Sequence, residues 1–174
     1  MLFPDFAALN PGYRAIAMSI VVRRATTADA GLVSELNADV QALHAAALPW
    51  RFKPPGPDTF PPAAAEALLA KPTHVVLIAE IDGEPVGYAY AETIHRPETT
   101  FHYAHAMVYL HHISVRPEWR RQGVGNALLE AVRSVGKDQG ITLMTAEVWF
   151  FNDDARAFFR RNGFSPYTER LWDR

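Results

Sequence analysis

The feature that most constrains the fold is a long β-branched stretch interrupted by a single Asp-Gly pair. THVVLIAEI (73–81) and PVGYAYAETI (85–94) both have the composition of strands. Asp82-Gly83 between them is the strongest short-range signal for a tight hairpin turn. The sequence therefore predicts a β-hairpin. The elements before and after it are predicted next.

Before the hairpin, residues 19–24 predict a first strand. Apolar residues recur at helical spacing from Thr27, interpreted as the N-cap, to about Ala47, which predicts an amphipathic helix. A proline-rich stretch follows and predicts a loop, after which a second, short helix is expected over 62–71.

After the hairpin, the pattern predicts further strands and helices in alternation. The strands are expected at 106–115, 141–149 and 164–172, and the helices at 122–138 and 153–161. This order is mixed α/β, with no internal repeat or linker. We expect one domain over 19–174, preceded by an N-terminal extension over 1–18.

Composition excludes several classes of function. The chain of 174 residues has no cysteine, and its formal net charge is -2. A thiol nucleophile, a disulfide scaffold and a zinc finger are ruled out, and no basic field exists to hold nucleic acid or an anionic membrane. No apolar run approaches the roughly 18 residues of a membrane helix, and MLFPDFAALN lacks the pattern of a secretory signal. We expect a soluble, cytoplasmic protein without a metal site.

The segment HHISVRPEWRRQGVGNALL carries the chemistry. A strand runs into Arg120 and Arg121, then Gly123 and Gly125, then directly into a helix. Backbone amides at a helix N-terminus suit a phosphate, and glycines let a ligand approach the backbone. Neither a dinucleotide fingerprint, which needs glycine where Leu128 stands, nor a Walker loop is present. The alternative is that the glycines only permit tight strand-to-helix packing.

Arg120, Gly123 and Gly125 match the acyl-CoA signature R-x-x-G-x-G, and the chain here resembles the GNAT superfamily of N-acetyltransferases. VWFFNDDARAFFRRNGF resembles the fifth strand and following helix of that superfamily. Two motifs in the right order are far more specific than one, and the resemblance covers about 20–172. It implies a single mixed α/β (α+β) domain with a central, mostly antiparallel sheet, whose fourth and fifth strands splay apart, flanked by about four helices.

The resemblance also implies acetyl-CoA as co-substrate. Its pantetheine arm is expected between the splayed strands, and its pyrophosphate at the amides that begin the following helix. Asn152 is expected to hydrogen-bond the arm, a role compatible with the alternative of a simple N-cap. The residues expected to bind acetyl-CoA are Ile113, Ser114, Val115, Arg120, Arg121, Gln122, Gly123, Val124, Gly125, Asn126, Asn152, Phe158 and Phe159.

Direct acyl transfer needs a base for the amine, donors for the oxyanion and a proton for the thiolate. The superfamily commonly places the base on the fourth strand. Strand alternation predicts that Tyr109, His111, Ile113 and Val115 share one face and His112 the other. Alignment with the family favours His111, whose imidazole titrates near neutral pH. The alternative is a pair of strand histidines that only pack or form hydrogen bonds.

A tyrosine that protonates the thiolate in many superfamily members is replaced here by Phe159. Either Tyr109, Tyr103 or Tyr167 substitutes for it, or the thiolate leaves unassisted, as a thiol pKa near 8.5 permits. Glu147 is a further titratable candidate, with a cross-strand partner as its other interpretation. The candidate catalytic residues are His111, Tyr109 and Glu147.

The leading hypothesis is an N-acetyltransferase that moves an acetyl group directly from acetyl-CoA to a primary amine of a small molecule or peptide. The alternative is a non-catalytic acyl-CoA sensor, which the missing tyrosine favours. A third reading, an O-acyl or antibiotic-modifying transferase, predicts an acidic acceptor cleft. The variable segment with His44, Trp50, Arg51 and Phe52 is expected to border the acceptor site. Family habit and the apolar N-terminal extension predict a homodimer.

Overall fold

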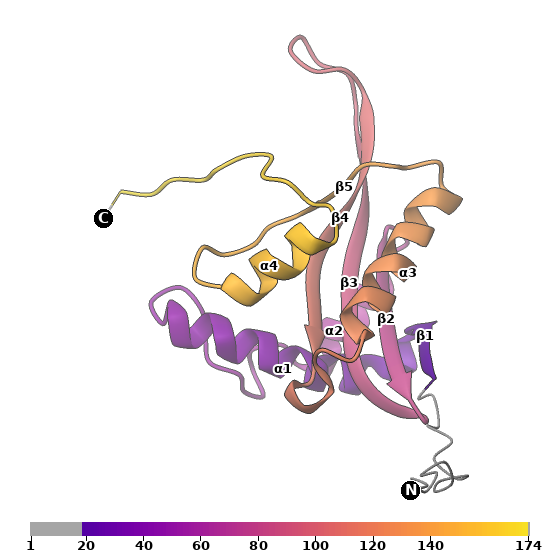
Figure 1. The fold of residues 1–174 in the computed structure, drawn as a ribbon, viewed down its shortest axis with the longest axis vertical. Helices are drawn as coiled ribbons and strands as arrows, with labels where there is room; N and C mark the ends of the chain where they lie inside the picture. The colour runs from indigo at the N-terminus through magenta and orange to yellow at the C-terminus, as the bar shows by residue number, and fades with distance from the viewer. Residues whose placement is uncertain (1–18, 174) are drawn as a thin grey trace, which may run out of the picture.

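A computed structural model describes residues 19–173, which form a five-stranded sheet with helices on both faces (Figure 1). Strands β1 to β4 pair antiparallel with their neighbours, whereas β4 and β5 pair parallel. The expected mixed α/β class with a mostly antiparallel sheet is therefore confirmed. The strands lie in chain order, namely β1 (Ile20–Arg24), β2 (His74–Ile81), β3 (Glu84–Arg96), β4 (His105–Val115) and β5 (Met144–Ala146).

Two apolar cores lie on opposite faces of the sheet, because side chains alternate along each strand. On one face, Leu77 and Ala89 pack under α3 (Val124–Asp138) and α4 (Asp153–Arg161). On the other face, Ile78 and Tyr88 pack under α1 (Ala30–Ala47) and α2 (Pro62–Leu69). The four helices thus divide into two pairs, and the functional cleft lies between elements of both pairs.

The β2–β3 hairpin forms as its turn signal predicts. Asp82 and Gly83 have φ angles of 52° and 81°, and Ile81 pairs with Glu84 across the turn. Positive φ at both central residues is the requirement of a tight hairpin turn that follows the strand twist. Beyond the body of the sheet, β3 and β4 continue together as a narrow hairpin, at the top of Figure 1.

Element boundaries differ from the predictions at the helix starts. Helix α1 begins at Ala30 after a 3-10 turn (Thr27–Asp29), and the N-cap of that turn is Thr26 rather than Thr27. Helix α3 begins at Val124, capped by Gly123, two residues after the predicted start. Helix α4 has the predicted bounds.

Two strand predictions are corrected. The strand expected at 141–149 is reduced to Met144–Ala146, because β4 and β5 pair only over these three residues before they separate. The strand expected at 164–172 does not form, and this segment is extended coil. Within the described chain, neither outer strand of the sheet pairs with it. A sequence with strand composition becomes a strand only where a neighbour offers its backbone.

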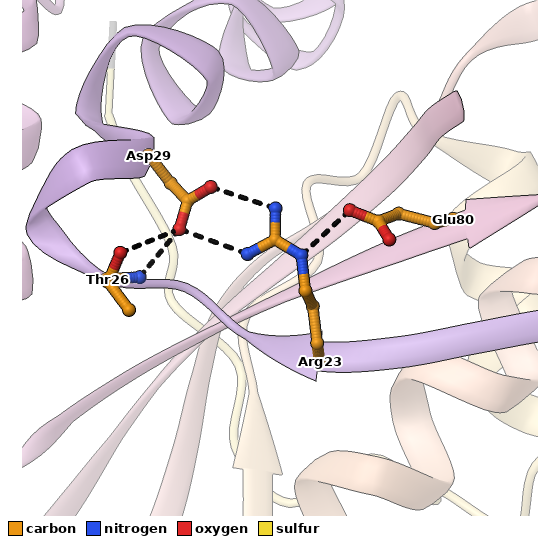
Figure 2. Close-up of polar contacts among 4 residues, drawn as sticks. All are labelled: Arg23, Thr26, Asp29 and Glu80. Atoms are coloured by element: carbon orange, nitrogen blue, oxygen red, sulfur yellow. Dashed lines mark hydrogen bonds and ion pairs between the residues drawn. The ribbon is translucent and has the colours of Figure 1, made fainter. Parts of the chain in front are cut away.

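A polar network joins β1 to β2 and to the start of α1 (Figure 2). The Arg23 guanidinium donates to both carboxylate oxygens of Asp29, at 2.8 and 3.0 Å, and to Glu80 at 2.7 Å. Asp29 also accepts from the Thr26 N–H at 2.8 Å. The hydrogen bond from Arg23 lowers the pKa of Asp29 to about 2. These contacts fix the point at which α1 leaves the sheet.

In the part of the chain that the structure describes, no helix combines the length and apolar character that crossing a membrane requires. The predicted N-terminal extension over 1–18 lies outside the described residues.

Candidate active site

The cleft opens where β4 and β5 separate. Their pairing ends at Leu110 and Ala146, and the chain after β5 leads to α4 instead of continuing beside β4. The predicted splaying of these strands is confirmed. The cleft holds about 410 Å³ of empty space that includes open solvent, and it is lined by Val40, His44, Leu110, His111, His112, Ile113, Glu147, Val148, Trp149, Asn152, Ala155 and Phe159.

A β-bulge in β4 lies at the mouth of this cleft. The register between β3 and β4 steps from Tyr90 opposite His112 to Ala91 opposite Leu110. His111 is therefore the extra residue on β4, with no Cα partner of its own on β3.

The bulge overturns the predicted sharing of faces along β4. Leu110 before the bulge and Ile113 after it both pack toward α3 and α4. Tyr109, His111 and His112 all lie on the opposite face, where their rings contact Tyr90 or one another. The prediction that set His111 and His112 on opposite faces is wrong, because one extra residue shifts the alternation by one position.

His111 is held by a carboxylate that the sequence analysis missed. Its Nε2 lies 3.0 Å from Oε2 of Glu92 on β3, and its ring stacks on Tyr90 with centroids 4.3 Å apart. The other carboxylate oxygen of Glu92 lies 3.7 Å from Nε2 of His74. When the His111 Nε2–H donates to Glu92, Nδ1 keeps its lone pair and is able to accept a proton. The signal for Glu92 was a carboxylate that directly follows the run PVGYAYA, which carries no charge.

His112 is in a different state. Asn37 Nδ2 donates to the Tyr88 hydroxyl at 2.8 Å, and that hydroxyl lies 3.0 Å from His112 Nδ1. Asn37 Nδ2 also lies 3.3 Å from His112 Nδ1. Because an amide nitrogen only donates, Nδ1 is the acceptor, and the imidazole proton is on Nε2. Burial, aided by the charges of His111 and His44, lowers the pKa of His112 to about 4. At neutral pH His112 is a hydrogen-bond donor and not a base.

Of the tyrosines considered as acids, Tyr109 lies next to His111. Its ring contacts His111 edge-on at 4.6 Å, and burial together with the charge of Glu147 raises its pKa. Glu147 lines the cleft and lies 3.8 Å from the Arg170 guanidinium. Tyr103 and Tyr167, the other tyrosines considered as acids, are 88% and 86% exposed. None of these three tyrosines is among the residues that line the cleft, but Tyr109 contacts His111, which does line it.

Phe159 and Phe158 have separate positions, although both were expected to bind acetyl-CoA. Phe159 is buried and lines the cleft, where it offers no hydroxyl. Phe158 lies against the start of α3 and approaches Gly125 instead. Phe158 is therefore placed beside the glycine loop and not in the cleft lining, and its contact with acetyl-CoA stays a prediction.

The loop before α3 has the geometry of an anion site. Arg121 and Gly123 have φ angles of 62° and 89°, which turns the chain abruptly into the helix. The first amides of α3 have no partner within the helix and carry its positive dipole end. Arg120 and Arg121 are exposed beside them and add positive charge. A Cβ on Gly125 would lie 3.2 Å from the Phe158 ring, so packing also contributes to the choice of glycine there.

The remaining residues predicted to bind acetyl-CoA are spread over these two regions. Ser114 and Val115 pair with β3 on one edge of β4, beyond the part that β5 covers. Val124 is buried, so only its backbone amide is available. Gln122 and Asn126 are exposed on the loop and on the first turn of α3.

Asn152 caps α4 and also lines the cleft, so its position is compatible with both roles that were considered. Its Oδ1 accepts from the Ala155 N–H at 3.0 Å and caps α4. Asn152 also lines the cleft, and among the described residues its Nδ2 has no hydrogen-bond partner. The amide group is therefore able to donate into the cleft.

The proline-rich loop brings aromatic side chains to the cleft. His44 lines it, and its ring stacks on Phe52 with centroids 5.0 Å apart. The Arg51 guanidinium lies 5.0 Å from the ring centre of Trp149, another residue of the lining. Trp50 contacts Trp172 at the surface.

Comparison with known proteins finds a matching family model and a protein of similar sequence. The model described as the acetyltransferase (GNAT) family matches residues 38–164. An aminoglycoside N(6')-acetyltransferase type 1 from Stenotrophomonas maltophilia is 28% identical over 158 residues, which covers 90% of this chain and 92% of the relative.

Solved structures share the fold at lower identity. A tetramutant of the BH1408 protein from Bacillus halodurans superposes with a TM-score of 0.84 at 22% identity, over 88% of this chain and 99% of that one. Aminoglycoside N-acetyltransferase AAC(6')-Iy in complex with CoA has a TM-score of 0.70 at 20% identity, over 95% and 98% of the two chains.

Proposed function

Because the chain belongs to the acetyltransferase (GNAT) family, we propose that His111, oriented by Glu92, is the base that prepares a primary amine for acetylation. The activity is the transfer of an acetyl group from acetyl-CoA to an amine-bearing small molecule. The proposal for the base rests on one observation, the 3.0 Å contact between His111 Nε2 and the Glu92 carboxylate at the mouth of the cleft.

Acetyl-CoA fits this chain at two places. The amides that begin α3, with Arg120 and Arg121 beside them, suit its pyrophosphate. The edge of β4 that β5 leaves uncovered suits the pantetheine arm, and Asn152 Nδ2 is available as a donor to it. The two places are close along the chain, because β4 leads through a 3-10 turn (Pro117–Trp119) into the loop before α3.

His111 and His112 have different roles in the proposed reaction. His111 Nδ1 accepts the proton that the ammonium loses, so that the amine nitrogen attacks the thioester carbonyl carbon. The His112 Nε2–H donates to the carbonyl oxygen as negative charge develops there. The new C–N bond replaces the C–S bond, and the thiolate leaves with its electron pair. The acylated nitrogen then loses its extra proton, which balances the proton that the thiolate takes up to become the free thiol. In this scheme one residue is a base and its neighbour is a donor, which agrees with their different surroundings.

Tyr109 and Glu147 complete the proposed catalytic group. The raised pKa of Tyr109 keeps its hydroxyl protonated at neutral pH, so it is the proposed acid for the thiolate. Glu147 stands at the rim of the cleft beside Tyr109, where its charge attracts an incoming ammonium. Phe159 occupies the position of the usual tyrosine and supplies no proton.

Substitution of His111 and Glu92 tests the proposal. We expect His111→Gln to lower kcat by about 100-fold and Glu92→Gln, which acts through His111, to lower it by about 10-fold. The acidic limb of the kcat profile should change in both variants, whereas acetyl-CoA affinity measured by calorimetry should not. His95→Gln is the matched control, since this histidine is exposed on the same strand as Glu92. Unchanged kcat in His111→Gln would transfer the role of base to Glu147 or Tyr109.

We also propose that the protein is cytoplasmic and that it forms a homodimer. Phe101 and Tyr103, at 90% and 88% exposure on the β3–β4 hairpin, are apolar groups that a second copy would cover. Sedimentation at micromolar concentration tests the dimer, and a monomer in that experiment would end the proposal.

A further inference from the structure

One wall of the cleft is built from aromatic rings that come from three separate parts of the chain. His44 from α1 stacks on Phe52 of the proline-rich loop. The Trp149 ring stands edge-on to Phe52 with centroids 5.2 Å apart, and it stacks on Phe151 at 6.0 Å and 15°. His44 and Trp149 both line the cleft that holds His111 and His112. The wall is defined as His44, Phe52, Trp149 and Phe151. His44 and Trp149 present it to the cleft, and Phe52 and Phe151 support these two rings by direct contact.

The wall lies on the side of the cleft away from the glycine loop. It is formed by the end of α1 and by the segment between β5 and α4, whereas the loop that suits the pyrophosphate precedes α3 (Figure 1). The sheet side of the cleft carries His111 and His112. An amine that meets His111 from the side opposite acetyl-CoA therefore has its carbon skeleton against these rings.

Negative charge is scarce around this wall. Of the described residues that line the cleft, Glu147 alone carries a carboxylate, and it lies 3.8 Å from the Arg170 guanidinium. Glu92 is occupied by His111. Arg51 lies 5.0 Å from the centre of the Trp149 ring and adds a positive charge beside the wall.

Burial lowers the pKa of His44, so its ring contributes as a neutral aromatic surface. Each additional ammonium group of a ligand requires a partner to offset its loss of water. The cleft is equipped for one such group at Glu147 and not for several.

We infer that the acceptor is a singly charged primary amine carried by a flat apolar or aromatic group, and not a polycationic amino sugar. This inference rests on the proposed function and names the substrate class of the same cleft. The aromatic wall holds the skeleton, Glu147 attracts the ammonium, and His111 removes its proton. These residues do not form the acidic cleft that an antibiotic-modifying enzyme requires. In this respect the cleft differs from what the name of the similar aminoglycoside N(6')-acetyltransferase suggests.

Thiol release from acetyl-CoA with three probe amines tests the substrate class. Tryptamine has one amine and a flat ring system, n-butylamine has the amine without the ring, and kanamycin is a polycationic amino sugar. We expect kcat/KM for tryptamine to exceed that of each other probe by at least about 10-fold, the contribution of one well-packed ring contact. Preference for kanamycin, or equal rates with tryptamine and n-butylamine, would overturn the inference and leave the acetyltransferase activity intact. Thiol release with none of the three would instead overturn the proposed function, and the inference with it.

Variants of the wall give a second readout. Trp149→Ala should raise KM for tryptamine about 10-fold with little change for n-butylamine, and Trp149→Phe should restore most of the loss. Phe101→Ala, at the exposed hairpin tip, is the matched control and should change neither. Arg51→Gln should weaken the discrimination against kanamycin, because it removes the added positive charge. A loss in Trp149→Ala that affects both monoamines alike, with unchanged acetyl-CoA affinity, would contradict the ring contact.

Discussion

Replacing His112 with Gln tests whether this imidazole is neutral in the folded chain. Burial lowers its pKa from 6.5 to about 4, whereas an unfolded histidine takes up a proton below about pH 6.5. Because the folded pKa is depressed, the contribution to stability is complete above the unfolded pKa and is lost as the pH falls toward 4. The difference amounts to about 3 kcal/mol in the free energy of unfolding at pH 4.

Urea denaturation between about pH 7 and pH 4 measures this difference. Gln retains an amide oxygen that accepts from the Tyr88 hydroxyl, so the variant keeps a hydrogen bond without a titrating group. We expect acidification to destabilise the wild type by about 3 kcal/mol more than His112→Gln. His95→Gln, an exposed histidine, is the control for a general effect of losing an imidazole. Parallel pH dependence of the wild type and His112→Gln would refute the neutral buried imidazole and, with it, the donor role.

Further predictions concern the glycine loop and the polar network at β1. Gly123→Asp and Gly125→Asp should abolish thermal stabilisation by acetyl-CoA, because a carboxylate repels the pyrophosphate, and the second also collides with Phe158. Equal thermal shifts in the wild type and both variants would contradict the anion site. Asp29→Asn should lower the free energy of unfolding at pH 7 by about 1 kcal/mol, since Arg23 loses its ion pair with Asp29 and keeps the one with Glu80. The Asp29 carboxylate stabilises the folded chain above its unfolded pKa, and this stabilisation is lost as the pH falls toward 2. In urea denaturation, the free energy of unfolding should therefore fall less steeply with acidification in the variant than in the wild type. An equal fall in both proteins would count against the ion pair.

Local chemistry predicted those parts of the fold that depend on neighbouring residues. The turn at Asp82 and Gly83 requires positive φ at both positions. Asp-Gly pairs are favoured in such turns, so the sequence predicts the hairpin. Helix α4 has its predicted bounds because Asn152 caps it and the glycine after Asn162 ends it. The loop before α3 could also be predicted, because a strand, a glycine turn and a helix follow one another directly in the sequence. The residues expected to bind acetyl-CoA there were named on this basis.

Pairing between distant segments decided what the sequence did not predict. The bulge at His111 exists because β3 and β4 change register there, and nothing local to His111 encodes it. Glu92 becomes a partner of His111 only through that pairing. The short β5 and the coil over 164–172 have the composition of strands, yet the first separates from β4 and the second has no strand beside it in the described chain.

Acetyl transfer in this cleft is tested most directly by measuring thiol release and acetylated amine in a single reaction. With acetyl-CoA and tryptamine, we predict equal molar amounts of free thiol and of a product heavier by one acetyl group, with rates that saturate in both substrates and fall about 100-fold in His111→Gln. A non-catalytic sensor predicts the opposite result, in which acetyl-CoA binds in a titration while no primary amine releases thiol or gains an acetyl group.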